Sequence, residues 1–146
     1  MNQKQRIIAV CLAGVAGSLL LVGVVSATLV RHVIQVAPVF AALGAVASQQ
    51  RWGPYAATPI FAIWLLLMVL IWLYLVGLQT FFTGTFSYAE VVLTVLVGLF
   101  SVLGISACVG SSVVTGIAGR AVAVVAFGGL QVGAMWVSFL EPFANR

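Results

Sequence analysis

The sequence predicts an all-α, polytopic integral membrane protein, a helical bundle with four long transmembrane helices and one shorter apolar helix. Hydrophobic residues make up 64% of the 146 residues and charged residues only 5%, whereas a soluble domain carries about a quarter charged residues. The mean hydropathy is +1.27. The chain also contains 15 glycines, and small residues let membrane helices approach one another closely.

Four apolar runs reach the length of about 20 residues that a helix needs to cross a bilayer. They are Ile7–Val30, Ala57–Leu78, Tyr88–Val109 and Thr115–Leu140. The first run follows Lys4 and Arg6, as the apolar part of a signal peptide would. It is too long for that role, and further spans follow it, so we interpret it as a retained first helix.

A fifth apolar run, Val33–Ser48, is shorter and contains Pro38. It either spans the membrane or forms a re-entrant element. A helix lying on the membrane surface needs a polar face, and only Gln35 and Ser48 are polar here. The surface position is therefore the poorest fit.

The distribution of basic residues favours five spans. Cytoplasmic loops of membrane proteins carry an excess of Lys and Arg. With five spans and a cytoplasmic N-terminus, Lys4, Arg6, Arg51 and Arg120 all face the cytoplasm. With four spans the basic residues divide equally between the two sides, so the rule favours the first arrangement.

Composition also limits the function. We expect one domain over residues 1–146 with no soluble domain, in a bacterial inner membrane. The basic residues form no stripe of the kind that binds nucleic acid. Cys11 and Cys108 form no CxxC pair, His32 is the only histidine, and no cluster of metal ligands is apparent. Without a nucleophile–base pair or a phosphate-binding loop, no enzyme activity is predicted.

Glu90 is one of two carboxylates in the chain, and a carboxylate near a membrane indicates a functional site by default. Its setting also fits a structural role. Ser87 precedes it by three residues, directly before an apolar run, and this spacing is typical of a capping box at a helix N-terminus. We favour the cap over a proton or cation site.

A line of small and polar residues follows Glu90 along the same predicted helix. Thr94, Ser101 and Cys108 succeed it at intervals of four and seven residues, and Gly98 lies on the same face. Such a line is a candidate polar path for water or ions. It is also typical of a seam between helices, which we favour.

The span Ala57–Leu78 carries a bulky ridge. Trp64, Met68 and Trp72 recur every four residues, although tryptophan in membrane helices concentrates at the interface. We expect ordinary packing or contact with a partner at this ridge. A lipophilic cofactor such as a quinone or pigment is the alternative occupant, and no cofactor is predicted outright.

The last span contains Gln131 near its middle, where an amide must find hydrogen-bond partners. On another side of this span Gly129 and Gly133 form a GxxxG motif, which indicates helix packing.

Taken together, these patterns predict a non-enzymatic accessory subunit. We expect it to pack in a homo-oligomer or in a larger membrane complex, in contact with lipid. The alternative is a small homo-oligomeric ion or proton channel or transporter, with its path along Glu90, Thr94 and Ser101.

Overall fold

The computed structural model describes residues 1–80, 85–109 and 116–140. The described residues form five α-helices and no strands: α1 (Gln3–Val25), α2 (Leu29–Ala47), α3 (Gly53–Leu75), α4 (Tyr88–Val109) and α5 (Ile117–Ser138). Each helix is long and apolar enough to cross a membrane. The prediction of an all-α polytopic membrane protein is therefore confirmed.

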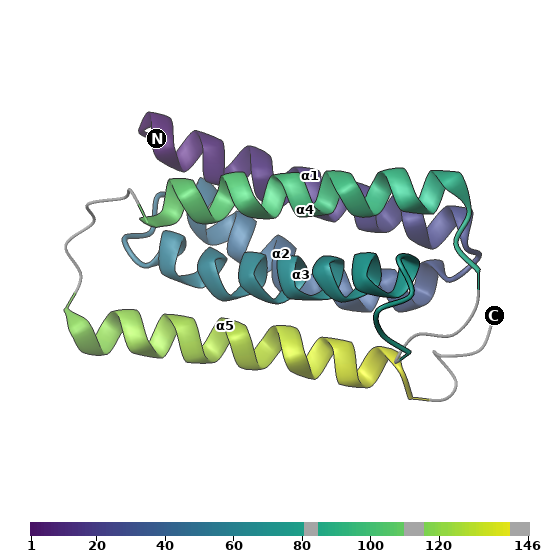
Figure 1. Cartoon of the computed structure of the whole chain (residues 1–146). Coiled ribbons are helices and arrows are strands. Elements are labelled where there is room, and N and C mark those ends of the chain that lie inside the picture. The colour runs from purple at the N-terminus through teal and green to yellow at the C-terminus, as the bar shows by residue number, and fades with distance from the viewer. Residues whose placement is uncertain (81–84, 110–115, 141–146) are drawn as a thin grey trace.

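The helices lie lengthwise beside one another and alternate in direction (Figure 1). Helices α1 and α4 form one side of the bundle, α2 and α3 form the middle, and α5 packs against α2 and α3 on the opposite side. As a result α5 touches neither α1 nor α4. It is the least buried helix: 17% of its most apolar segment is buried, against 33% or more in each of the others.

The expectation of a short fifth helix was wrong. The run Val33–Ser48 is the larger part of α2, which begins at Leu29 and is long enough to span like its neighbours. Hydropathy placed the boundary too late because Arg31 and His32 interrupt the apolar pattern, yet both lie inside the first turns of α2.

The reversal between α1 and α2 takes only Ser26, Ala27 and Thr28. Helix α1 ends in a Schellman motif, in which the Thr28 N–H donates to the Gly23 carbonyl and the Ala27 N–H to the Val24 carbonyl. Ala27 adopts the left-handed conformation that this motif requires, with φ of 55°. This compact turn lets the second span start four residues earlier than the apolar run suggested.

Helix α3 also begins earlier than predicted. The predicted span began at Ala57, whereas Gly53 and Pro54 are already the first residues of the helix. Proline is well accommodated in the first turn, because the N–H that it lacks has no partner there anyway. Trp52, the N-cap residue, is exposed.

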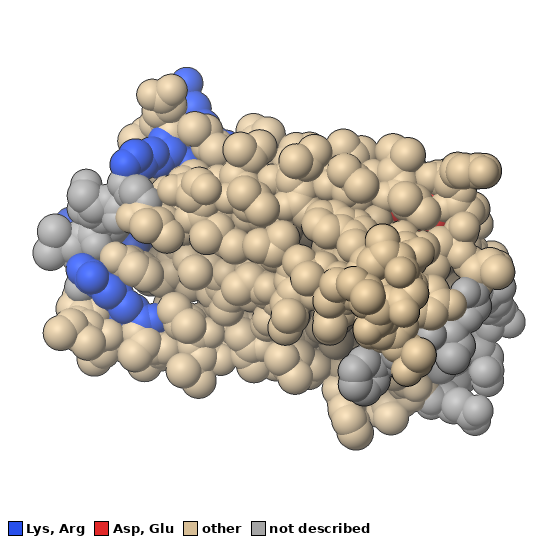
Figure 2. Space-filling model, in the orientation of Figure 1, with Lys and Arg blue, Asp and Glu red and all other residues tan. Residues whose placement is uncertain are grey.

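The charged residues divide between the two ends of the bundle. Lys and Arg residues gather at one end, and a small acidic area is visible near the other (Figure 2). The basic end carries Lys4, Arg6, Arg51 and Arg120, whereas Arg31 and Glu90 lie in the first turns of α2 and α4 at the opposite end. This arrangement agrees with the five-span distribution of basic residues predicted from the sequence.

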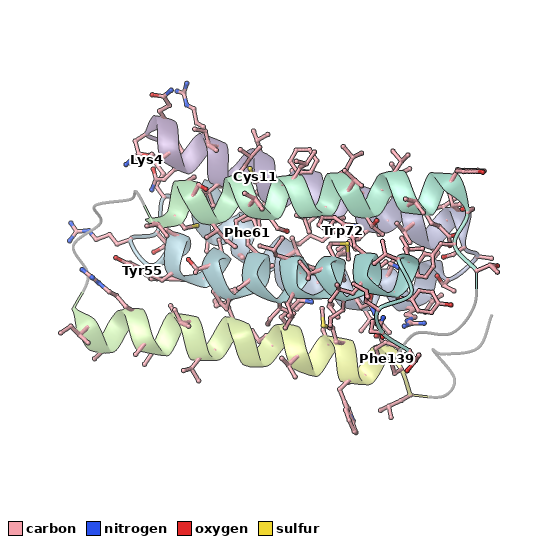
Figure 3. The ribbon with its side chains drawn as sticks, in the orientation of Figure 1. Lys4, Cys11, Tyr55, Phe61, Trp72 and Phe139 are labelled. Carbon is pink, nitrogen blue, oxygen red and sulfur yellow. The ribbon has the colours of Figure 1, made fainter. Side chains whose placement is uncertain are left out.

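Aromatic rings of α3 lie on glycines of α4 in the core. A Cβ atom added to Gly104 would lie 2.4 Å from the ring of Phe61, and one added to Gly98 would lie 2.4 Å from the ring of Trp72. Both rings project into the space between the two helices (Figure 3). Phe61 is fully buried. Close packing of this kind is what holds a membrane bundle together, since lipid is as apolar as the side chains.

Candidate functional site

A cavity of about 1080 Å³ lies between the helices in the half of the bundle away from the basic end. All five helices contribute to its wall. Its volume is at the upper limit of the roughly 300–1,000 Å³ that is usual for small-molecule sites. The cavity is therefore large enough for an elongated ligand.

One end of the cavity is polar and is built by the α1–α2 turn and the start of α2. Ser26, Thr28, Arg31, His32 and Gln35 all line it. The Ser26 and Thr28 hydroxyls are hydrogen-bonded to each other. The His32 Nδ1 lies 3.0 Å from the Thr28 carbonyl oxygen and 3.1 Å from the Thr28 hydroxyl.

Arg31 packs against an aromatic ring at the end of α5. Its guanidinium carbon lies 4.0 Å from the centre of the Phe139 ring of α5, which is a cation–π interaction. Its Nε atom is buried and has no hydrogen-bond partner. Phe139 itself lies just beyond the end of α5 (Figure 3).

Glu90 lines the same cavity from α4. Its Oε2 accepts hydrogen bonds from the Ser87 N–H and hydroxyl, each at 2.7 Å, and the Glu90 N–H donates to the Ser87 hydroxyl at 3.3 Å. The predicted capping box is confirmed. Because Glu90 is only half-buried, it can cap α4 and also line the cavity.

The aromatic ridge divides between the cavity and the helix seam. Trp64 and Met68 are almost fully buried and line the cavity. Trp72 does not line it; its indole N–H donates to the Thr94 hydroxyl at 3.1 Å and its ring covers Gly98. Thr94 lines the cavity too. The aromatic ridge of α3 and the polar line of α4, which the sequence analysis treated separately, therefore meet at one site.

The remainder of the predicted polar path does not reach the cavity. Ser101 and Cys108 are buried farther along α4, beyond the last cavity residue of that helix, Val97. The Ser101 hydroxyl has no hydrogen-bond partner. In this conformation the polar line is thus partly cavity wall and partly seam.

Gln131 belongs to a polar seam between α2 and α5. Its Nε2 donates to the Gln35 backbone carbonyl at 3.0 Å, and the Gln35 Nε2 donates to the Ser138 hydroxyl at 2.9 Å. Pro38 lies inside α2 and has no N–H, so it deprives the preceding turn of a hydrogen bond. Neighbouring helices commonly compensate for such a break in membrane proteins, and Gln131 donates to this turn.

Gly129 and Gly133 face away from the rest of the chain. Both are exposed, and a Cβ added to either would meet no atom within 4 Å. The glycines that pack most closely inside the bundle are others, on α1, α3 and α4. The predicted packing role of the GxxxG pair therefore concerns a surface that the chain itself leaves uncovered.

The comparisons with known proteins give no relative for this chain. No family model matches it, and neither the curated proteins nor the solved structures yield a match. Within the described residues, no group of three His, Cys, Asp or Glu side chains is placed to hold a metal ion.

Sequence reasoning did not single out Arg31 and Gln35 as site residues, and it gave His32 no further role. A signal was present, because Arg31 and Gln35 are four residues apart and share one helix face with Thr28. Without knowledge that α2 begins at Leu29, these residues could not be assigned to a helix face.

Proposed function

We propose that this protein is a non-enzymatic accessory subunit of the bacterial inner membrane that assembles through α5 with a second copy of itself. One observation supports this most strongly: the outer face of α5, formed by Ala118, Val122, Val125, Gly129, Gly133 and Trp136, is exposed in full. The inner face of the same helix, with Ala123, Gln131 and Ser138, is buried against α2 and α3.

The shape of the outer face of α5 suits another helix. Ala121, Val122, Val125 and Ala126 line a shallow depression on it, and the two glycines continue the small surface by one and two turns. Small residues at this spacing allow backbones to approach closely, which is the main source of helix association in lipid. A helix face that contacts only lipid does not require such small residues.

Replacing both Gly129 and Gly133 with Leu should abolish self-association. The added side chains would hold the two backbones apart without disturbing the chain's own packing, because both positions face open space. Native mass spectrometry of protein extracted in mild detergent would measure the change from oligomer to monomer. Gly17→Leu is the matched control, since Gly17 is exposed on α1 with equally open surroundings. An oligomer that survives the double substitution would contradict the proposal.

The second candidate function is a proton-coupled or ion-coupled carrier. It is favoured by the one-sided cavity, in which Glu90 and Thr94 face Arg31 and His32, as expected for one state of a carrier. Beyond the cavity the core is closed by fully buried side chains that include Leu12, Ile60 and Phe61.

The carrier alternative predicts a flux across liposomes that contain the purified protein. A fluorescent pH indicator inside the liposomes would report proton movement, and Glu90→Gln should reduce it at least tenfold if Glu90 carries the proton, as one protonation site in a coupled path. Wild-type liposomes that show no flux above protein-free liposomes would exclude this alternative.

A further inference from the structure

Arg31 is the only Lys or Arg among the described residues that line the cavity. Its Nε atom is buried without a hydrogen-bond partner, and its guanidinium forms no ion pair with any residue that the structure describes. The Phe139 ring covers it at 4.0 Å but contributes no negative charge. Burying a cation is costly unless it is paired, so the cavity is suited to a ligand with an anionic group beside Arg31.

Glu90 supplies the opposite charge to the same cavity without neutralising Arg31. The two side chains lie on different helices, both line the cavity, and no ion pair joins them. Ser87 donates both of its hydrogen bonds to one carboxylate oxygen, Oε2, which leaves Oε1 for another donor. A cavity with separate positive and negative groups is complementary to a ligand that carries both charges.

The depth of the cavity indicates what the rest of that ligand is. Arg31 and Glu90 lie in the first turns of their helices, at the level of the lipid headgroups. From there the wall continues to Trp64 and Val97. At 1.5 Å per residue, Trp64 lies roughly 15 Å before the last residue of α3, and Val97 lies roughly 15 Å after the first residue of α4. That is about half of the roughly 30 Å hydrocarbon layer, and its lining there is apolar. The cavity therefore extends through one leaflet, polar at the headgroup level and apolar below it.

We propose that this cavity is a binding site for one molecule of phosphatidylethanolamine from the leaflet opposite the basic end. The phosphate pairs with Arg31, the ammonium donates to Glu90, and an acyl chain lies along Trp64, Met68 and Val97. The three N–H donors of an ethanolamine ammonium can reach a carboxylate oxygen, whereas a choline group has none and a glycerol headgroup has no positive charge. The site lies on the opposite side of α5 from the outer face, so it is independent of self-association.

The test uses native mass spectrometry of the whole protein released from nanodiscs. The nanodiscs contain equal amounts of phosphatidylethanolamine, phosphatidylcholine and phosphatidylglycerol with identical acyl chains. The wild type should retain one phosphatidylethanolamine per chain in preference to the other two lipids. Arg31→Gln and Glu90→Gln should each weaken this retention about tenfold or more, as expected when one partner of a desolvated charge pair is removed.

Two controls separate a specific site from general effects. Gln also forms a capping box at the position of Glu90, so Glu90→Gln keeps the start of α4 intact and decides the question even if Arg31→Gln fails to fold. Arg51→Gln removes an exposed charge at the opposite end and should change nothing. Equal retention of all three lipids, retention that neither cavity substitution alters, or a bound quinone in place of a phospholipid would each overturn the proposal.

Discussion

Replacing Gly104 with Leu should strongly destabilise the bundle. Even the first added carbon would lie 2.4 Å from the Cε2 and Cζ atoms of Phe61, and Phe61 is fully buried, so it has no free space to enter. Inserting carbons into a packed core typically costs about 1–3 kcal/mol and occasionally more. A loss of about 3 kcal/mol corresponds to a Tm lower by roughly 6–12 °C for a chain of this size.

Thermal unfolding in detergent, followed by circular dichroism, would measure this loss. Gly17→Leu serves as the control, because that glycine faces open space and its replacement should leave Tm nearly unchanged. A second test pairs a larger residue at position 104 with a smaller one at position 61. In a Gly104→Ala background, Phe61→Leu should restore part of the lost stability, because the smaller side chain makes room for the added carbon. If Gly104→Leu unfolds at the wild-type temperature, the contact between α3 and α4 described here is wrong.

The second large effect concerns the sidedness of the loops. With five spans, Ala27 and Thr80 face one compartment and Gln50 faces the other, because one helix separates each loop from the next. If Val33–Ser48 were re-entrant, Ala27 and Gln50 would share a side and Thr80 would lie opposite. Single cysteines at these three exposed positions, in a background with Cys11 and Cys108 replaced by Ser, distinguish the two arrangements.

A membrane-impermeant maleimide applied to intact cells would read out the result. Ala27→Cys and Thr80→Cys should react at once, and Gln50→Cys only after the membrane is permeabilised, since the basic end is expected in the cytoplasm. Labelling of Ala27→Cys together with Gln50→Cys, and not of Thr80→Cys, would establish the re-entrant arrangement instead. The three positions thus test the number of spans and their orientation in one experiment.

The sequence predicted helix boundaries well wherever a local signal was present. The bounds Tyr88–Val109 of α4 agree with the prediction at both residues, because the Ser87–Glu90 capping box fixes where this helix begins. At the start of α2 the hydropathy pattern was misleading: Arg31 is charged, yet it already belongs to the first turn of the helix. Hydropathy averages over such residues and cannot tell a charged helix turn from a loop.

The candidate site was predictable only in parts. Periodicity grouped Glu90 with Thr94 and Trp64 with Met68, since residues on one helix face follow from spacing alone. That these two faces enclose one cavity together with Arg31 depends on how α2, α3 and α4 are oriented around their axes. Likewise the GxxxG motif at Gly129 predicted a packing surface. The aromatic rings of α3 instead lie against Gly98 and Gly104, which form no such motif and could not be singled out from the sequence.

The uneven placement of charge between the two ends makes the protein an electric dipole along the membrane normal. Among the described residues, four basic side chains lie at one end, whereas the charges of Arg31 and Glu90 cancel at the other. A membrane potential of about 100 mV acts on each elementary charge with about 2.3 kcal/mol. In an inside-negative membrane, the orientation with the basic end outside would therefore be higher in energy by about 9 kcal/mol than the orientation with that end inside. The membrane potential of an energised cell and the positive-inside rule would thus favour the same orientation of the bundle.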